Sequence, residues 1–422
     1  MNKQNSLPGP DDIYREVLPN GITVLTRSNF NSPSVVMAGY FEAGALFDPD
    51  EKLGLAEYTV LSLMRGTKNR TFDEIYHALE SVGAGLVFNT GVHKSGFNGR
   101  SLAEDLPLLL ELFSEALTKP VFPKAELEKL RAQLLTGLDI RAEDTGDMAS
   151  MAFDNILFKG HPYSRPEDGF PETIKRINRN DLVKFHREHY GPRGMVIAIV
   201  GGVKPEAAVK QVKRALGGWQ VNGQKAMPEL PPLKPLRKTM SKHHRIAGKS
   251  QSDLIIGTNG PMRRDPEFMS ASIGNNILGQ FGMMGRIGEV VREKSGLAYY
   301  AYSSMSAGLG PGSWEVSAGV NPQNIKKASD LILDELKRFV QEDVTAEELA
   351  DTKANFIGRL PLSLESNGGV ANALLNIERY QLGLDYYHRY EGLVKEVTAE
   401  NVLNTARKFI DPDKLIIASA GP

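Results

Sequence analysis

A weak internal repeat constrains the fold of this chain more than any other feature of its sequence. Residues 177–201 (INRNDLVKFHREHYGPRGMVIAIVG) resemble residues 397–421 (VTAENVLNTARKFIDPDKLIIASAG), with a constant offset of 220 positions. Pro192 matches Pro412 at this offset. Each copy has the pattern of an amphipathic helix, a turn at the proline and then a buried strand. The repeat predicts two tandem domains of the same fold.

A second pair of segments extends the repeat. Residues 121–133 resemble residues 343–355 at an offset of 222 positions. Between the halves lies a proline-rich stretch, MPELPPLKP, and prolines stiffen such a stretch into a semi-rigid linker. We therefore expect one domain at 1–225, a second at 236–422 and a linker at 226–235.

Within each half, strand and helix patterns alternate without the regular rhythm of a parallel α/β fold. Extended hairpins covered by long helices are typical of the α+β class. We expect α+β: two duplicated domains, each a mainly antiparallel sheet with helices packed on one face. The expected strands are 22–27, 34–42, 86–98, 253–258, 298–307 and 313–320, and the expected helices are 71–82, 106–117, 124–143, 323–341, 346–360 and 367–382.

Composition excludes several classes of function. The 422 residues carry 50 Lys and Arg against 51 Asp and Glu, so no general charge attracts nucleic acid or an anionic membrane. The absence of Cys excludes disulfides, Cys-ligated zinc and cysteine nucleophiles. The N-terminus lacks the apolar core of a signal peptide, and no apolar stretch reaches membrane-spanning length. We expect no nucleic-acid or membrane partner, and a cytoplasmic location, or a periplasmic one if a leader was removed.

Residues 54–67 have the sequence GLAEYTVLSLMRGT, which contains a motif whose reactive residues are replaced. They resemble the catalytic helix of the pitrilysin/insulinase-like zinc peptidases, G-L-A-H-F-x-E-H-x-x-F-K-G-T, where H-x-x-E-H binds zinc and activates water. Glu57 stands at the first zinc His, Val60 at the catalytic Glu and Leu61 at the second His. Valine and leucine offer no lone pair and no exchangeable proton, so we expect no zinc site here.

The resemblance continues along nearly the whole chain in the order of that family. Residues 18–21 (LPNG), 41–45 (FEAGA) and 161–163 (HPY) match its short blocks, and residues 277–299 match L-G-x-x-x-x-S-R-L-x-x-x-L-R-E-x-x-G-L-A-Y. Family members take a third zinc ligand, a Glu, from a later segment. The corresponding residues here, 134–138 (LLTGL), contain no carboxylate.

The resemblance also implies which catalytic parts this chain keeps. Active members use an Arg and a Tyr, seven residues apart, from the domain opposite the zinc; Arg292 and Tyr299 have this spacing. A guanidinium and a phenol can both hydrogen-bond a substrate carbonyl and the charge that develops on it. Gly279, Gly282 and Gly285 match the family's glycine-rich loop, where mobility would help substrate entry. A plain turn before a helix is the alternative interpretation.

This combination resembles one half of the heterodimeric processing peptidases. It implies a non-catalytic subunit of a zinc metalloendopeptidase, without a cofactor of its own, that binds and orients a peptide substrate. Zinc would lie in a homologous partner with an intact H-x-x-E-H, and the two chains would form a clam shell. Two alternatives stay open: an inactive structural core-type subunit of a larger complex, and a zinc peptidase acting alone through unrecognised ligands.

His186 and His189 are spaced to chelate a metal from one helix. The second copy of the repeat has Ala406 and Phe409 at these positions. We therefore favour structural roles for both histidines.

Overall fold

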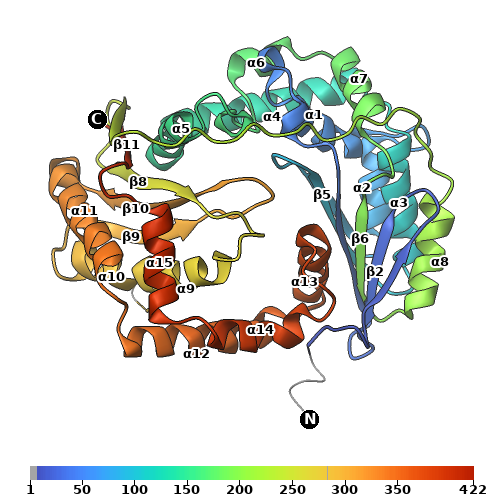
Figure 1. Cartoon of the computed structure of the whole chain (residues 1–422). Coiled ribbons are helices and arrows are strands. Elements are labelled where there is room, and N and C mark those ends of the chain that lie inside the picture. Colours follow the sequence, from blue (N-terminus) through green and yellow to red (C-terminus); the bar gives the residue numbers. More distant parts are fainter. Residues whose placement is uncertain (1–6, 283) are drawn as a thin grey trace. The chain divides into compact units, whose positions relative to one another are not determined.

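The computed structural model describes residues 7–282 and 284–422 and divides into two compact units, each built on one sheet (Figure 1). Each unit combines segments from both halves of the repeat, whereas the predicted domains, 1–225 and 236–422, are the continuous halves. Unit 1 consists of Met1–Leu138, Arg165–Glu229 and Leu360–Arg389, and unit 2 of Asp139–Ser164, Leu230–Arg359 and Tyr390–Pro422.

The sheet of unit 1 has the strand order β1-β2-β6-β3-β5-β4. All neighbouring strands are antiparallel except β2 and β6, which are parallel. The strands are β1 (Tyr14–Val17), β2 (Thr23–Ser28), β3 (Ser34–Phe41), β4 (Gly85–Asn89), β5 (Ser95–Leu102) and β6 (Val196–Gly201).

The sheet of unit 2 has the order β7-β11-β8-β10-β9, and only β7 and β11 are parallel. The five strands β2-β6-β3-β5-β4 of unit 1 have the same arrangement, and β1 has no counterpart among the described residues of unit 2. Two mainly antiparallel sheets of the same topology confirm the α+β prediction. The strands are β7 (Met240–Arg245), β8 (Ser252–Gly260), β9 (Ala298–Met305), β10 (Gly312–Val320) and β11 (Ile416–Gly421).

Helices of unit 1 pack on one face of its sheet, where α2, α3 and α8 lie together in Figure 1. Val35 and Met37 of β3 point into this layer, and both are fully buried in the main core of the unit. The helices of this unit are α1 (Leu55–Ser62), α2 (Phe72–Glu80), α3 (Leu106–Thr118), α4 (Lys124–Glu143), α6 (Pro171–Arg176), α7 (Arg179–His189), α8 (Pro205–Leu216) and α13 (Asn367–Tyr380).

The helices of unit 2 follow the same plan. Leu254 and Ile256 of β8 pack in one core with Phe339 of α11, while Ile255 points to the other face. The helices are α5 (Thr145–Leu157), α9 (Phe268–Gly279), α10 (Gly285–Gly288), α11 (Ile325–Gln341), α12 (Ala346–Ser363), α14 (Tyr386–Lys395) and α15 (Ala399–Phe409), and the division between the units falls within α4, α12 and α14.

The second face of each sheet is covered in part by a helix from the opposite half of the repeat. In unit 1, α13 packs on β3 and β6, and the guanidinium of Arg379 lies 4.6 Å from the ring centre of Tyr40. In unit 2, α5 packs on β8 and β11, where Phe153 and Ala418 join one apolar cluster. Besides the helices expected on one face, the apolar faces of α5 and α13 therefore each cover part of the second face of a sheet.

The repeat is reproduced in detail. Helix α7 begins after the capping box of Asn178, and α15 begins after that of Thr398, which lies 220 positions later. Helices α5 and α13 each cover the sheet of the opposite half, and we call them the exchanged helices. They are equivalent in the repeat, since their N-caps, Asp144 and Ser366, are 222 positions apart. Each copy of the repeat therefore supplies the same helix to the sheet of the other copy.

Most predicted elements agree with the structure to within a few residues, and α4 agrees at both ends. Residues 86–98, expected as one strand, instead form a hairpin, because the break after Asn89 separates β4 from β5. The helix expected at 323–341 begins at Ile325, after a 3₁₀ turn at Pro322–Asn324. Residues 226–235 form neither helix nor strand. In the described parts of the chain, no helix has the length and apolar character needed to cross a membrane.

Candidate functional site

The altered motif forms α1, and a buried carboxylate holds the start of this helix. Asp48 accepts hydrogen bonds of 2.9 Å from the backbone N–H groups of Gly54 and Ala56, and its side chain is only 3 % exposed. Burial raises the pKa of Asp48 to about 7, although these two amides and Arg165 act to lower it. Gly54 has a φ of +89°, a backbone conformation that favours glycine.

Two of the three motif positions carry side chains that cannot ligate a metal. Val60 is fully buried, and Leu61 is half-buried against the core of unit 1. Leu134 and Leu135, in the segment expected to supply the third ligand, pack against the same core. Glu57 is half-buried on α1. These side chains do not fit a zinc ion, and among the described residues no group of three or more His, Asp or Glu side chains could hold a metal.

A tyrosine joins α1 to α4. The hydroxyl of the fully buried Tyr58 donates a 2.6 Å hydrogen bond to the backbone carbonyl of Leu127. The guanidinium of Arg131 lies 5.4 Å from the centre of the same ring. Burial raises the pKa of Tyr58 to about 12, so its hydroxyl is a donor at every physiological pH. These contacts attach α1, the helix of the motif, to α4.

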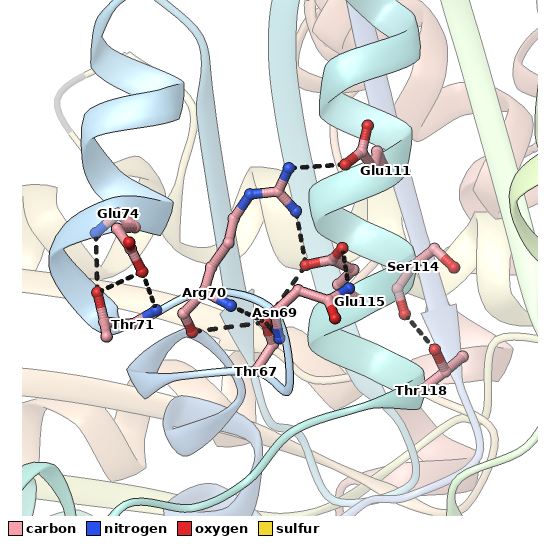
Figure 2. Close-up of polar contacts among 9 residues, drawn as sticks. All are labelled: Thr67, Asn69, Arg70, Thr71, Glu74, Glu111, Ser114, Glu115 and Thr118. Atoms are coloured by element: carbon pink, nitrogen blue, oxygen red, sulfur yellow. Dashed lines mark hydrogen bonds and ion pairs between the residues drawn. The ribbon is translucent and has the colours of Figure 1, made fainter.

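The end of the motif is held by a buried glutamate that sequence reasoning missed, and Figure 2 shows Glu115 of α3 at the centre of this network. Asn69 donates to Glu115 at 2.7 Å, Thr67 donates at 3.3 Å, and Arg70 pairs with Glu115 and with Glu111, each at 2.7 Å. Burial acts to raise the pKa of Glu115, but Asn69 and Arg70 outweigh it and lower the pKa. The loop after α1 is thus rigidly anchored, and no sequence pattern indicated the partner.

The predicted glycine-rich loop joins α9 to α10 in unit 2. Gly279 ends α9 so close to β9 that a Cβ atom there would lie 2.1 Å from the backbone nitrogen of Ser303. Gly282 and Gly285 have φ values of +58° and +63°. The close approach to β9 requires glycine at position 279, and the positive φ values at positions 282 and 285 favour it, whether or not the loop also moves.

A cavity of about 330 Å³ adjoins this loop. Arg286 is buried beside it and donates two hydrogen bonds of 2.6 Å to the carboxylate of Glu348. Other lining residues are mainly acidic, with an aromatic ring at the side of the loop: Phe281, Glu289, Glu293, Glu347 and Asp351.

Arg292 lies in a π-helical turn, Glu289–Glu293, that follows α10. Its side chain is 34 % exposed, and its guanidinium is 3.6 Å from the carboxylate of Glu293. The turn is continued by a backbone hydrogen bond from Gly296 to the carbonyl of Arg292. Single π turns often occur at functional sites because they displace a side chain from the regular helical surface.

Tyr299 lies at a β-bulge in β9, which is one of the two edge strands of the sheet in unit 2. Tyr300 pairs with Gly319 and Ala298 pairs with Val320, so Tyr299 is the extra residue. Its side chain is 70 % exposed. A bulge redirects the side chain that it carries, so the phenol of Tyr299 is presented to solvent.

The neighbouring tyrosine has a different environment. Tyr300 donates a hydrogen bond to the buried carboxylate of Asp253, which also accepts one from Thr145 at the start of α5. Burial and this acceptor raise the pKa of Tyr300. Tyr300 therefore serves to attach α5 to the sheet.

His186 and His189 lie on α7 but serve packing. The Nε2 atom of His186 is 2.7 Å from the carbonyl of Leu117. The ring of His189 lies between those of Phe47 and Phe185, at centroid distances of 4.1 Å and 4.5 Å. Burial lowers the pKa of His189 to about 4, so its ring is neutral near pH 7.

Comparisons with known proteins concern the family and the fold. Residues 23–167 match the family model for insulinase (peptidase family M16), and residues 176–356 match that for the peptidase M16 inactive domain. An uncharacterized zinc protease of Streptomyces coelicolor is 27 % identical over 372 residues, which cover 87 % of this chain and 80 % of the relative.

Two further matches concern a human relative and a solved structure. The mitochondrial cytochrome b-c1 complex subunit 1 of Homo sapiens is 25 % identical over 272 residues, which cover 63 % of this chain and 55 % of the relative. The crystal structure of a peptidase M16 inactive domain from Pseudomonas fluorescens matches with a TM-score of 0.87 and 27 % identity, covering 97 % of this chain and 98 % of that one.

Proposed function

Because the chain belongs to the insulinase-like peptidase family M16, we propose that it is a non-catalytic subunit that orients peptides for hydrolysis at a partner's zinc. One contrast within the chain carries this proposal. Two of the three motif positions on α1, Val60 and Leu61, hold buried or half-buried apolar side chains, whereas Arg292 and Tyr299 present polar groups to solvent. The chain thus offers groups that can bind a carbonyl but lacks the set of ligands that a zinc ion needs.

The proposal needs a partner that supplies zinc. Val60 and Leu61 cannot ligate a metal, and no carboxylate occupies residues 134–138. A homologous chain with an intact H-x-x-E-H would hold the zinc ion and the general base, and would enclose the peptide together with this chain. The names of relatives, zinc protease among them, support this class of reaction.

Within that complex, Arg292 and Tyr299 would contact the substrate. The guanidinium is permanently charged and the phenol is a donor, so both can hydrogen-bond the scissile carbonyl and the oxyanion that forms on attack. The exposed bulge at Tyr299 supports this role, because a buried phenol could not reach a bound peptide.

A second candidate is a structural subunit of a larger complex. The relative in the human cytochrome b-c1 complex favours it. The two candidates differ in what they require of Arg292 and Tyr299: a structural subunit needs neither side chain for peptide turnover.

The test begins with the tagged chain, purified from its source cells with whatever accompanies it. We expect a partner with an intact H-x-x-E-H in equal amount, zinc only in that partner, and peptidase activity only in the complex. Removing one oxyanion donor typically costs about 10²–10³ in kcat, so Arg292→Ala and Tyr299→Phe should each lower kcat/KM by that order while the complex stays assembled.

Two exposed residues provide matched controls. Arg264→Ala in unit 2 and Tyr76→Phe on α2 remove the same groups elsewhere on the surface and should leave turnover unchanged. Normal turnover in both Arg292→Ala and Tyr299→Phe would contradict the substrate-binding role. Association with membrane complexes that lack the motif would favour the structural candidate.

A further inference from the structure

Positive charge is concentrated in one segment of this nearly neutral chain. Between Glu229 and Asp253 there are six Lys or Arg residues and two His residues, and no acidic residue. The segment contains β7, whose sequence MSKHHR is exposed at almost every position. Lys249 pairs with Glu143 at 3.0 Å. Among the described carboxylates, none pairs with Lys238, Lys242 or Arg245.

Strand β7 is also an open edge of its sheet. It pairs with β11 on one side and with no other described strand. The backbone N–H groups of Met240 and Ile246 donate hydrogen bonds on the β11 side, at 2.9 Å and 2.6 Å. Backbone groups alternate in direction along a strand, so the N–H and C=O groups of Ser241, His243 and Arg245 point away from β11. They are available to one further strand.

The equivalent edge in unit 1 shows what such a position can hold. Strand β2, the counterpart of β7, is covered by β1, which pairs with it in antiparallel register. The segment PDDIYREV consists of a turn that carries Asp11 and Asp12, followed by the extended strand β1. Its Asp12 pairs with Arg27 of β2 at 2.6 Å. Unit 2 contains no strand of its own at this position among its described residues.

We propose that the β7 edge binds an extended, acidic segment of a partner protein as a sixth strand. Backbone hydrogen bonds to Ser241, His243 and Arg245 would supply affinity. Carboxylates of the segment would pair with Lys242 and Arg245, which project from opposite faces of β7 because side chains alternate along a strand. The proposal concerns a surface remote in sequence from Arg292 and Tyr299 and does not depend on the proposed peptidase role.

Two features favour a peptide over other anionic ligands. Unpaired backbone donors and acceptors alternate along the open edge, and a strand matches both kinds, whereas the phosphodiester groups of nucleic acids accept hydrogen bonds but do not donate them. At the equivalent position of the repeat, β1 already pairs with β2, and Asp12 in the turn before β1 pairs with Arg27 of β2. Lysine on an edge strand also blocks unwanted pairing between sheets, and this protective role predicts that no acidic peptide binds.

The test uses a fluorescent peptide with the sequence of residues 8–19 (PGPDDIYREVLP), with fluorescence anisotropy of its mixture with the full chain as the readout. A control peptide carries Asn and Gln in place of its Asp and Glu. We expect saturable binding of the acidic peptide and binding at least about tenfold weaker for the neutral copy, because charge pairs and their steering are lost. Binding that is equal for both peptides, or absent, would overturn the proposal.

Two variants separate strand addition from simple attraction between charges. Lys238→Glu/Lys242→Glu/Arg245→Glu reverses the charge, and Ser241→Pro removes one outward N–H while keeping every cation. Each should weaken binding by about tenfold or more. If Ser241→Pro lowers the thermal midpoint of the chain, His243→Pro removes the next outward N–H and serves in its place.

Three outcomes would contradict strand addition. The first is a loss of binding on charge reversal together with full binding by the proline variants, which would indicate electrostatic attraction alone. The second is tighter binding of double-stranded DNA than of the acidic peptide, and the third is tighter binding of vesicles rich in anionic lipid. Either of the last two would assign the surface to that ligand instead.

Discussion

Helix α1 and the segment that carries Arg292 and Tyr299 differ in what surrounds their key side chains. Val60 on α1 is fully buried in the core, whereas Tyr299 is 70 % exposed at the edge of a sheet. Burial of an apolar side chain stabilises a fold, and an exposed phenol contributes little. Val60 therefore contributes to the stability of the fold, whereas a contribution to stability does not explain the presence of Arg292 and Tyr299 at the surface.

The largest expected effect comes from placing the family's glutamate back into α1. Val60→Glu would bury a carboxylate without a partner, and we expect the free energy of unfolding to fall by about 4 kcal/mol. Urea denaturation measures this change. Val183→Glu on the neighbouring α7, at a side chain that is 37 % exposed, is the matched control and should change stability by less than about 0.5 kcal/mol. Equal stability of both variants would contradict the conclusion that the buried side chain at position 60 stabilises the fold.

Two arginines six positions apart provide the next test. Arg286 is buried and bonded to Glu348, with Glu335 3.8 Å away, so Arg286→Ala leaves the half-buried carboxylate of Glu348 without its cation, while Glu335 keeps its pair with Arg338. We expect a loss of about 3 kcal/mol, against less than about 0.5 kcal/mol for Arg292→Ala. Chemical denaturation of both variants at neutral pH decides this, and a similar loss in each would contradict the distinction.

The same arginine sets a dependence on pH in acid. Burial acts to raise the pKa of Glu348, but hydrogen bonds from Arg286 and from the backbone of Thr345 outweigh it and lower the pKa to about 2. The usual value of a glutamate is higher, so this stabilisation is complete above about pH 4.5 and is lost as the pH falls toward 2. Arg286→Ala should flatten the acid limb of the stability profile.

A third prediction uses the exchanged helices. Burial, and to a lesser extent Glu315, raise the pKa of Asp154 on α5 to about 7. The folded state then holds a proton that the unfolded chain releases near pH 4, so stability falls as the pH rises from about 4 to 7. The equivalent position on α13 is Asn376.

Asp154→Asn should remove this slope and stabilise the chain by about 1–3 kcal/mol at pH 8, while leaving the similar contribution of Asp48 in place. Thermal or urea unfolding at pH 5 and pH 8 measures the difference. A slope that is unchanged in the variant would show that Asp154 does not retain its proton.

The smallest expected effects concern two tyrosines. Tyr58→Phe removes a buried hydrogen bond to Leu127 and should cost about 1 kcal/mol. Tyr299→Phe removes an exposed hydroxyl and should change the free energy of unfolding by less than about 0.3 kcal/mol. Any loss of turnover in this variant would then reflect the missing hydrogen bond to the substrate and not unfolding. Precise denaturation curves of the two variants resolve this difference. A loss of stability in Tyr299→Phe as large as that in Tyr58→Phe would remove the distinction.

Much of the fold could be predicted because local patterns determine local structure. Residues 124–143 were predicted as a helix to both ends, and the offset of 220 positions predicted that α7 and β6 recur as α15 and β11. The hairpin at 86–98 was missed because strand propensity continues through its turn. The altered motif positions were visible, but the anchoring of their loop by Glu115 was not, since that partner lies 46 positions from Asn69.

The sequence by itself determined the two-fold repeat, the family and the apolar side chains at Val60 and Leu61 of the motif, because these depend on residue identity and spacing. Only the tertiary structure decided which sheet each exchanged helix covers, because an apolar helix face does not specify its partner. It also decided that Tyr299 is exposed while Tyr300 is hydrogen-bonded, since a single bulge changes which neighbour turns outward. The open, basic edge at β7 depends in the same way on the absence of a neighbouring strand among the described residues, which is a property of the assembled sheet.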